Sequence, residues 1–130
     1  MYLFSVALTS CSYGETVNSG DVVKFPNVKT NYGIQNLTLF KQTGIFTCEQ
    51  KGIYMFFSSM VSHSRDGSFQ WYLSNSTYLT TVYVGKQNDY QSGSGMITVE
   101  LAVGDTVSLI SFIDNYVVYS FSCYTLIKIK

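Results

Sequence analysis

Apolar and polar residues alternate with a period of two along much of this chain, as they do in strands with one buried face. Tyr2, Phe4, Val6 and Leu8 share one face of an expected first strand. Further strands are expected at residues 22–25, 37–40, 69–73, 79–84, 97–101, 107–113 and 116–129. The polar segments 62–68 and 85–95 are expected to be loops, as is 11–20. Apolar residues nowhere repeat at helical spacing, so the pattern predicts an all-β sandwich or barrel, with residues 1–130 forming a single domain.

Residues 42–57 are the most informative stretch, because two glycines there each open a β-rich run. The apolar residues recur at two-residue spacing: Phe46 with Cys48, then Tyr54 with Phe56. This spacing predicts two heavily buried strands joined by a tight turn.

The composition limits the classes of protein to consider. Hydrophobic residues make up 46% of the 130 residues and charged residues only 12%, so the chain has enough apolar surface to fold, and part of its surface is expected to be covered by another subunit. The formal net charge is zero, which argues against a nucleic-acid partner. The sequence contains no run of about twenty apolar residues, so no membrane span is predicted.

Several motifs carry a resemblance to a known family. Gly44-Ile-Phe-Thr-Cys48 is followed by Gly52-Ile-Tyr-Met-Phe56, and later come Leu101 with Gly104-Asp105-Thr-Val107 and finally Phe121-Ser122. In this order they resemble the globular head of complement C1q, a relative of the tumour necrosis factor fold, and most of all invertebrate C1q-domain proteins. Cys123 stands where that family usually has glycine, Ser58 replaces an expected aromatic residue, and the segment 31–39 is longer than usual.

The resemblance implies a jelly roll of roughly ten antiparallel strands in two sheets, assembled as a homotrimer. The sequence favours a covered sheet face independently. The closing strands carry apolar residues on both faces, as Val107 and Leu109 do against Ile110 and Phe112. Coverage of these strands by loops is the alternative.

Catalysis is not expected. His63 is the only histidine, and no nucleophile can be paired with a positioned base and acid. The three cysteines, Cys11, Cys48 and Cys123, lack the spacing of metal ligands. We expect Cys48 to be a buried thiol, whereas one disulfide with a leftover thiol, or a bridge between chains, stays open.

Carbohydrate binding is the favoured positive hypothesis, because aromatic faces meet sugar C–H groups while amides and hydroxyls satisfy the sugar hydroxyls. The candidate residues are Arg65, Tyr83, Asn88, Asp89, Tyr90, Gln91 and Tyr116. Arg65 could pair with the carboxylate of a sialic acid. Tyrosines that simply fit pleated, half-buried strands are the alternative.

The family resemblance also raises calcium, which some members bind near the trimer apex. Here Asp89, beside Asn88, could supply oxygen ligands, and a solvated turn is the alternative. Asn36-Leu37-Thr38 and Asn75-Ser76-Thr77 match the N-glycosylation pattern and agree with secretion.

The resulting hypothesis is a secreted, trimeric, lectin-like pattern-recognition protein of innate immunity that binds glycans or microbial surfaces through apical loops. The alternatives are a module that binds a protein ligand, as signalling or synapse-organising members do, and an extracellular structural matrix module.

Overall fold

The computed structural model describes residues 5–62, 67–74, 76–85, 91–112 and 116–130 as two antiparallel sheets and one short helix. The larger sheet contains β1 (Ala7–Cys11), β2 (Glu15–Val17), β3 (Asn27–Tyr32), β5 (Gly52–Ser62), β8 (Gln91–Leu101), β10 (Tyr116–Val118) and β11 (Cys123–Lys128). The smaller sheet contains β4 (Phe46–Thr47), β6 (Gly67–Leu73), β7 (Thr77–Gly85) and β9 (Thr106–Ser111). The predicted jelly-roll sandwich is therefore confirmed.

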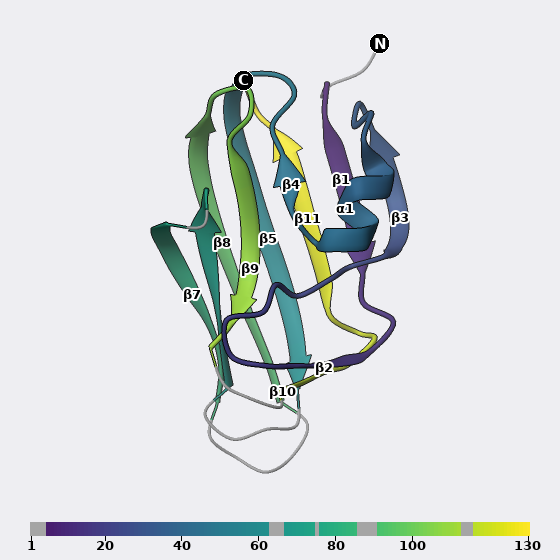
Figure 1. Cartoon of the computed structure of the whole chain (residues 1–130), viewed down its shortest axis with the longest axis vertical. Helices are drawn as coiled ribbons and strands as arrows, with labels where there is room; N and C mark the ends of the chain where they lie inside the picture. The colour runs from purple at the N-terminus through teal and green to yellow at the C-terminus, as the bar shows by residue number, and fades with distance from the viewer. Residues whose placement is uncertain (1–4, 63–66, 75, 86–90, 113–115) are drawn as a thin grey trace.

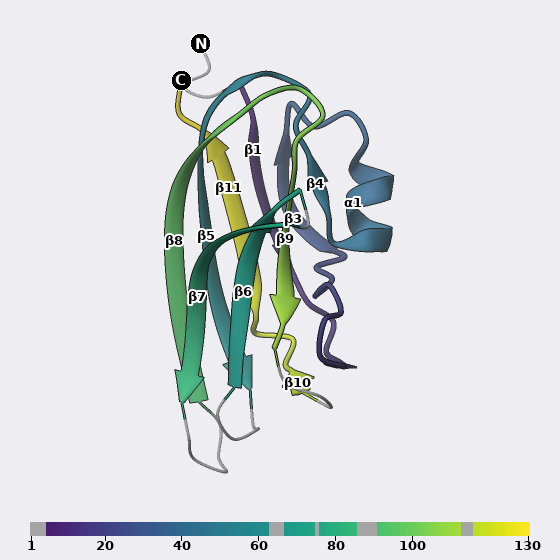
Figure 2. The ribbon, with the colours of Figure 1, turned by 60° about the vertical axis from the view of Figure 1, so that its left-hand side comes forward.

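Long-range pairing organises both sheets. In the larger sheet the strands run β2-β10-β5-β11-β1-β3, and β8 pairs with the other edge of β5. In the smaller sheet they run β4-β9-β6-β7. The two sheets lie face to face as the layers of a sandwich (Figures 1 and 2).

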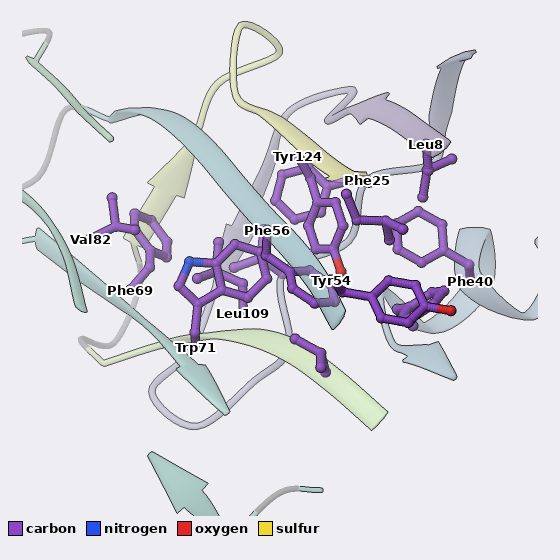
Figure 3. Packing of buried hydrophobic residues seen from close by; sticks show 14 of the residues in the cluster. Leu8, Phe25, Phe40, Tyr54, Phe56, Phe69, Trp71, Val82, Leu109 and Tyr124 are labelled. Carbon is purple, nitrogen blue, oxygen red and sulfur yellow. The ribbon is translucent and has the colours of Figure 1, made fainter. Parts of the chain in front are cut away.

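Aromatic side chains fill the space between the layers, as residues 42–57 predict. Phe56 lies at the centre of this group, with its ring centroid 5.6 Å from that of Trp71 and 6.1 Å from that of Tyr124 (Figure 3). Phe46, Cys48 and the residues just named are at most 2% exposed. Because such burial contributes roughly 1.5–3 kcal/mol for each large apolar side chain, this motif specifies the fold rather than a ligand site.

The strand expected at residues 37–40 is wrong, because this segment forms the helix α1 (Leu37–Thr43). The Asn36 side chain accepts a hydrogen bond from the backbone N–H of Leu39, and Gly44 ends the helix with φ 75°. Both ends are thus capped, and the one fully buried side chain, Phe40, packs on Tyr124.

The added helix lies outside the sandwich, beside β3 and β4 (Figures 1 and 2). The Glu49 carboxylate accepts hydrogen bonds from the backbone N–H groups of Gln35 and Asn36 and so fixes the start of α1. No helix in the described part of the chain has the length and apolar character needed to cross a lipid bilayer.

Three loop boundaries also differ from expectation. The segment 11–20 contains β2, and the expected strand 116–129 is divided into β10 and β11. The segment 85–95 was expected to be a loop throughout, but β8 begins at Gln91.

The glycines of β8 have a packing role, since a Cβ atom on Gly93 would lie 2.3 Å from the carbonyl oxygen of Tyr83.

The cysteine pairing left open by the sequence is resolved by the fold. Cys11 and Cys123 form a disulfide within the chain, across β1 and β11. Cys48 is free and buried, as expected. Its thiol donates to the carbonyl oxygen of Gln50, and burial raises its pKa, so it is held in the neutral, unreactive form.

Candidate functional site

The outer face of the larger sheet is apolar at its centre. Phe57 on β5 lies opposite Met96 on β8, and the two side chains are 38% and 61% exposed. Met55 and Ile127 are opposite each other one step along the same face. We call Met55, Phe57, Met96 and Ile127 the apolar face. Exposed apolar groups gathered at the centre of a sheet are typical of protein–protein contacts.

The ends of the longest strands gather at one end of the sandwich. Ser62 at the end of β5 pairs with Gln91 at the start of β8, and Gly67 pairs with Gly85. Val118 on β10 also pairs with Ser62. The described strand ends that the segments 63–66, 86–90 and 113–115 connect therefore lie at this end of the molecule (Figure 1).

Most of the residues predicted from the sequence to bind carbohydrate belong to these connections. Arg65, Asn88, Asp89 and Tyr90 lie outside the described residues, as does the glycosylation candidate Asn75. Their roles in binding glycan, calcium or an attached sugar stay predictions.

Three predicted residues lie on strands instead. Tyr83, on β7, is 51% exposed and faces outward. Gln91 begins β8 with its side-chain oxygen against Gly85, and its amide nitrogen is buried without a hydrogen-bond partner among the described residues. Tyr116 begins β10 and pairs with Val17. All three residues thus lie near the same end of the sandwich, and Tyr83 is on the outer face of the smaller sheet.

The smaller sheet presents a second candidate surface, on the side away from the core. Its inward residues are buried, whereas several alternate positions, Tyr78 and Phe112 among them, are exposed. We call this surface the tyrosine face, made of Gln70, Tyr72, Tyr78, Thr81, Ile110 and Phe112.

Two tyrosines of this face are in contact across β6 and β7. The ring centroids of Tyr72 and Tyr78 are 6.1 Å apart with the planes at 70°, an edge-to-face arrangement. The Tyr72 hydroxyl donates to the Gln70 side-chain oxygen at 3.0 Å, and the Tyr78 and Thr81 hydroxyl oxygens are 2.6 Å apart. Both phenol rings are therefore held in place by hydrogen bonds as well as by each other.

A shallow groove continues from Tyr72 toward the end of β9. Tyr72, Gln70, Ile110 and Phe112 line it together with the turn at Ser19 and Gly20. Its volume of about 320 Å³ lies at the small end of the range of roughly 300–1,000 Å³ for small-molecule sites. Phe112 is 59% exposed at one side of this groove, so an aromatic ring is available there to a bound molecule.

Gln70, Tyr72 and Phe112 were not among the candidates chosen from the sequence, although a signal for the first two existed. Phe69, Trp71 and Leu73 alternate toward the core, and that alternation places the intervening Gln70 and Tyr72 on the outer face.

The residues that define the apolar face and the tyrosine face include no His, Cys, Asp or Glu. Within the ranges that the structure describes, no three His, Cys, Asp or Glu side chains gather as metal ligands would. Apolar contact, stacking and neutral hydrogen bonding are the interactions that the two faces offer.

Comparison with known proteins agrees with this architecture. The family model of the C1q domain matches residues 3–124. A search of curated proteins finds no match.

Solved structures are similar over nearly the whole chain. The globular domain of the zebrafish complement 1qA protein superposes with a TM-score of 0.75 at 18% identity, over 96% of this chain and 98% of that one. Eiger TNF from S. frugiperda gives a TM-score of 0.74 at 12% identity, over 99% and 94%. Murine APRIL, at pH 5.0, gives 0.74 at 13% identity, over 95% and 98%. At these identities the likeness concerns the fold alone.

Proposed function

This chain belongs to the C1q domain family, and we propose that it is a secreted, trimeric recognition protein that binds glycans or other repetitive surface patterns in innate immunity. Domains of the C1q and TNF-like families are ligand-binding modules that commonly form trimers and are generally extracellular. The step from this general role to a lectin is our proposal.

The proposal of a trimer rests on the apolar face. Phe57 and Met96 lie in contact range on neighbouring strands of the larger sheet, with a large share of both side chains open to solvent. Burying them against another subunit would recover roughly 25 cal/mol for each Å² of apolar surface removed from water. A second copy of the chain supplies such a surface without a further partner.

The disulfide supports secretion. Structural disulfides persist in oxidising compartments and are rare in the cytosol. Cys11 and Cys123 form such a disulfide within the chain, whereas Cys48 is free and buried.

A trimer with three weak sites binds a repetitive surface more tightly than a single chain does. Three equal sites on a rigid head can bind a repetitive surface together, and linked binding of this kind raises avidity by about 10²–10⁴ without any new contact. Repeating glycans on microbial surfaces are ligands of this form.

The proposal is tested by light scattering combined with a glycan array. We expect a mass of three chains at micromolar concentration and binding to immobilised glycans that soluble sugar competes away. A monomer would contradict the avidity mechanism. A trimer that ignores every glycan and binds one protein tightly would favour the alternative of a protein-ligand module of the signalling or synapse-organiser kind over both a lectin and an extracellular structural matrix module.

A further inference from the structure

The three strands that carry the tyrosine face contain no charged residue. Residues 67–73, 77–85 and 106–112 lack Asp, Glu, Lys, Arg and His altogether. The outward groups are instead phenols, hydroxyls, one amide and two apolar side chains. A solvent-facing sheet without any charge is uncommon, because charged residues supply about a quarter of the residues of an average globular domain.

A β-bulge brings the two tyrosines of this face together. Trp71 pairs with Thr80, but the next pair is Tyr72 with Tyr78, so Leu79 is skipped. Leu79 packs against the core, whereas Tyr78 is 52% exposed on the outside. Bulges are enriched beside functional sites, where they redirect a side chain, and this one creates the aromatic pair.

The groove beside Tyr72 has a fixed wall. The backbone N–H of Gly20 donates to the carbonyl oxygen of Ser111 at 2.9 Å, and the Ser19 hydroxyl donates to that of Phe112 at 3.0 Å. Tyr72, Tyr78 and Gln70 are already oriented by their own hydrogen bonds. A ligand therefore meets a preformed surface and loses little free energy in ordering it.

We propose that the tyrosine face is a binding site for a neutral oligosaccharide, with Tyr72, Tyr78 and Phe112 as stacking platforms and Gln70 as the polar partner. The inference rests on the proposed lectin function and names its ligand class and its site. Ring faces pack on the C–H groups of sugars, while the Gln70 amide supplies two N–H donors and an acceptor oxygen for sugar hydroxyls.

The composition of the three strands favours a neutral ligand over an anionic one. They carry no cation, so they offer no ion-pair partner to a sialic acid or a phosphate. A protein ligand is the competing occupant, because aromatic residues are also enriched at protein interfaces, and a chain that binds no sugar on this face would favour it.

The extent of the face fits a chain of sugars. Neighbouring strands lie about 4.8 Å apart, so the path from Tyr78 on β7 to Phe112, just after β9, crosses about 10 Å of sheet and also runs four residues, roughly 13 Å, along the strand direction. The apolar face lies on the opposite layer of the sandwich. Self-association through that layer would leave three tyrosine faces directed outward.

The test compares substitutions within the tyrosine face with the substitution of an exposed tyrosine outside it. Wild type, Tyr78→Ala, Phe112→Ala, Tyr78→Phe, Asp89→Ala, Tyr90→Ala and Tyr13→Ala are titrated against chitohexaose, laminarihexaose, mannohexaose and sialyllactose on a glycan surface. Tyr13 is 69% exposed and lies outside the tyrosine face, so it controls for loss of any exposed tyrosine. Thermal unfolding verifies that each variant folds.

We expect wild type to bind at least one neutral hexamer. Tyr78→Ala and Phe112→Ala should each weaken that binding about tenfold, as the loss of one ring contact of about 1.4 kcal/mol requires. Tyr13→Ala should bind within about threefold of wild type, a free-energy change of less than 1 kcal/mol. Tyr78→Phe keeps the ring but loses the hydroxyl contact with Thr81, so its affinity should lie between those of wild type and Tyr78→Ala.

Other outcomes overturn the inference in distinguishable ways. If Tyr78→Ala and Phe112→Ala bind like wild type while Asp89→Ala and Tyr90→Ala do not, the site lies in the loops, and the lectin function stands without this face. If only sialyllactose binds, the neutral ligand class is wrong. If wild type binds none of the sugars, the inference and the proposed lectin function fall together.

Discussion

Cys11 and Cys123 lie directly opposite each other on β1 and β11, with their Cα atoms 4.0 Å apart and their sulfur atoms bonded. The bridge joins residues 112 positions apart and so ties the first described strand to the last. One bridged strand, β11, is the neighbour of β5, which carries Phe57 of the apolar face.

Removing this bridge should destabilise the protein strongly. The entropy of closing a loop of roughly 100 residues predicts a loss of up to about 4.7 kcal/mol for Cys11→Ser combined with Cys123→Ser. Urea denaturation of the double variant, compared with wild type in the presence and absence of dithiothreitol, measures it. Cys48→Ala is the control, and it should retain the effect of dithiothreitol. Equal stability of wild type and double variant would show that the bridge does not constrain the unfolded chain.

The close approach of β7 and β8 requires glycine at position 93. A Cβ atom there would lie 2.3 Å from the backbone oxygen of Tyr83, whereas one at Gly95 would meet the Val82 side chain at 2.8 Å. Because a side chain can move more easily than a strand, Gly93→Ala should cost about 2–3 kcal/mol and Gly95→Ala less. Thermal unfolding tests this order, with Ser94→Ala, exposed between them, as control. A Gly95→Ala variant less stable than Gly93→Ala would contradict the packing argument.

Strand positions were predictable where burial alternates. Phe56 and Trp71 occupy the core because every second residue of β5 and β6 faces inward. Such an alternation of apolar and polar residues can be read directly from the sequence. The helix α1 left no such signal. It has seven residues and one fully buried side chain, so its caps at Asn36 and Gly44 matter more than periodicity.

The candidate site was less predictable, because it depends on register. The alternation in β6 places Tyr72 outside, but only the bulge after Trp71 brings Tyr78 opposite it. Likewise, the pairing of Cys11 with Cys123 follows from the alignment of β1 with β11, which has no local signature.

Glycosylation at Asn36 is compatible with its structural role. Asn36 is exposed, and its Oδ1 accepts the hydrogen bond from Leu39, while a glycan would attach through Nδ2. After expression in a secretory eukaryotic host, mass spectrometry should find a glycan at Asn36 that Thr38→Ala abolishes. Thr38→Ala keeps the helix cap and should leave stability unchanged, whereas Asn36→Ala should also lose about 1 kcal/mol. A peptide carrying unmodified Asn36 in the wild-type secreted protein would refute this prediction.

The stability of the fold should decline in alkali. Burial raises the pKa of the Cys48 thiol above its ordinary 9.0, and it raises the pKa of Tyr54 and of Tyr124 above the ordinary 10.0. The unfolded chain therefore releases these protons at lower pH than the folded chain does. Their contribution to stability is complete below about pH 9 and is lost as pH rises further. Urea denaturation from about pH 7 to 11 should show the decline, and Tyr54→Phe should lessen its slope. A free energy of unfolding that stays constant across that range would contradict the assignment.

The apolar face should control the state of assembly. Phe57→Glu combined with Met96→Glu places two carboxylates opposite each other on β5 and β8, at positions where the proposed trimer buries apolar surface. Burial of an unpaired charge costs several kcal/mol, so light scattering should report one chain of 14.6 kDa where wild type reports three. Val103→Glu, at a residue 67% exposed in the turn after β8, should remain trimeric. The monomeric double variant should keep its affinity for a single oligosaccharide, because the tyrosine face lies on the other layer. It should lose avidity for a glycan-coated surface, because one chain offers only one site. A double variant that stays trimeric would place the subunit contact elsewhere on the molecule.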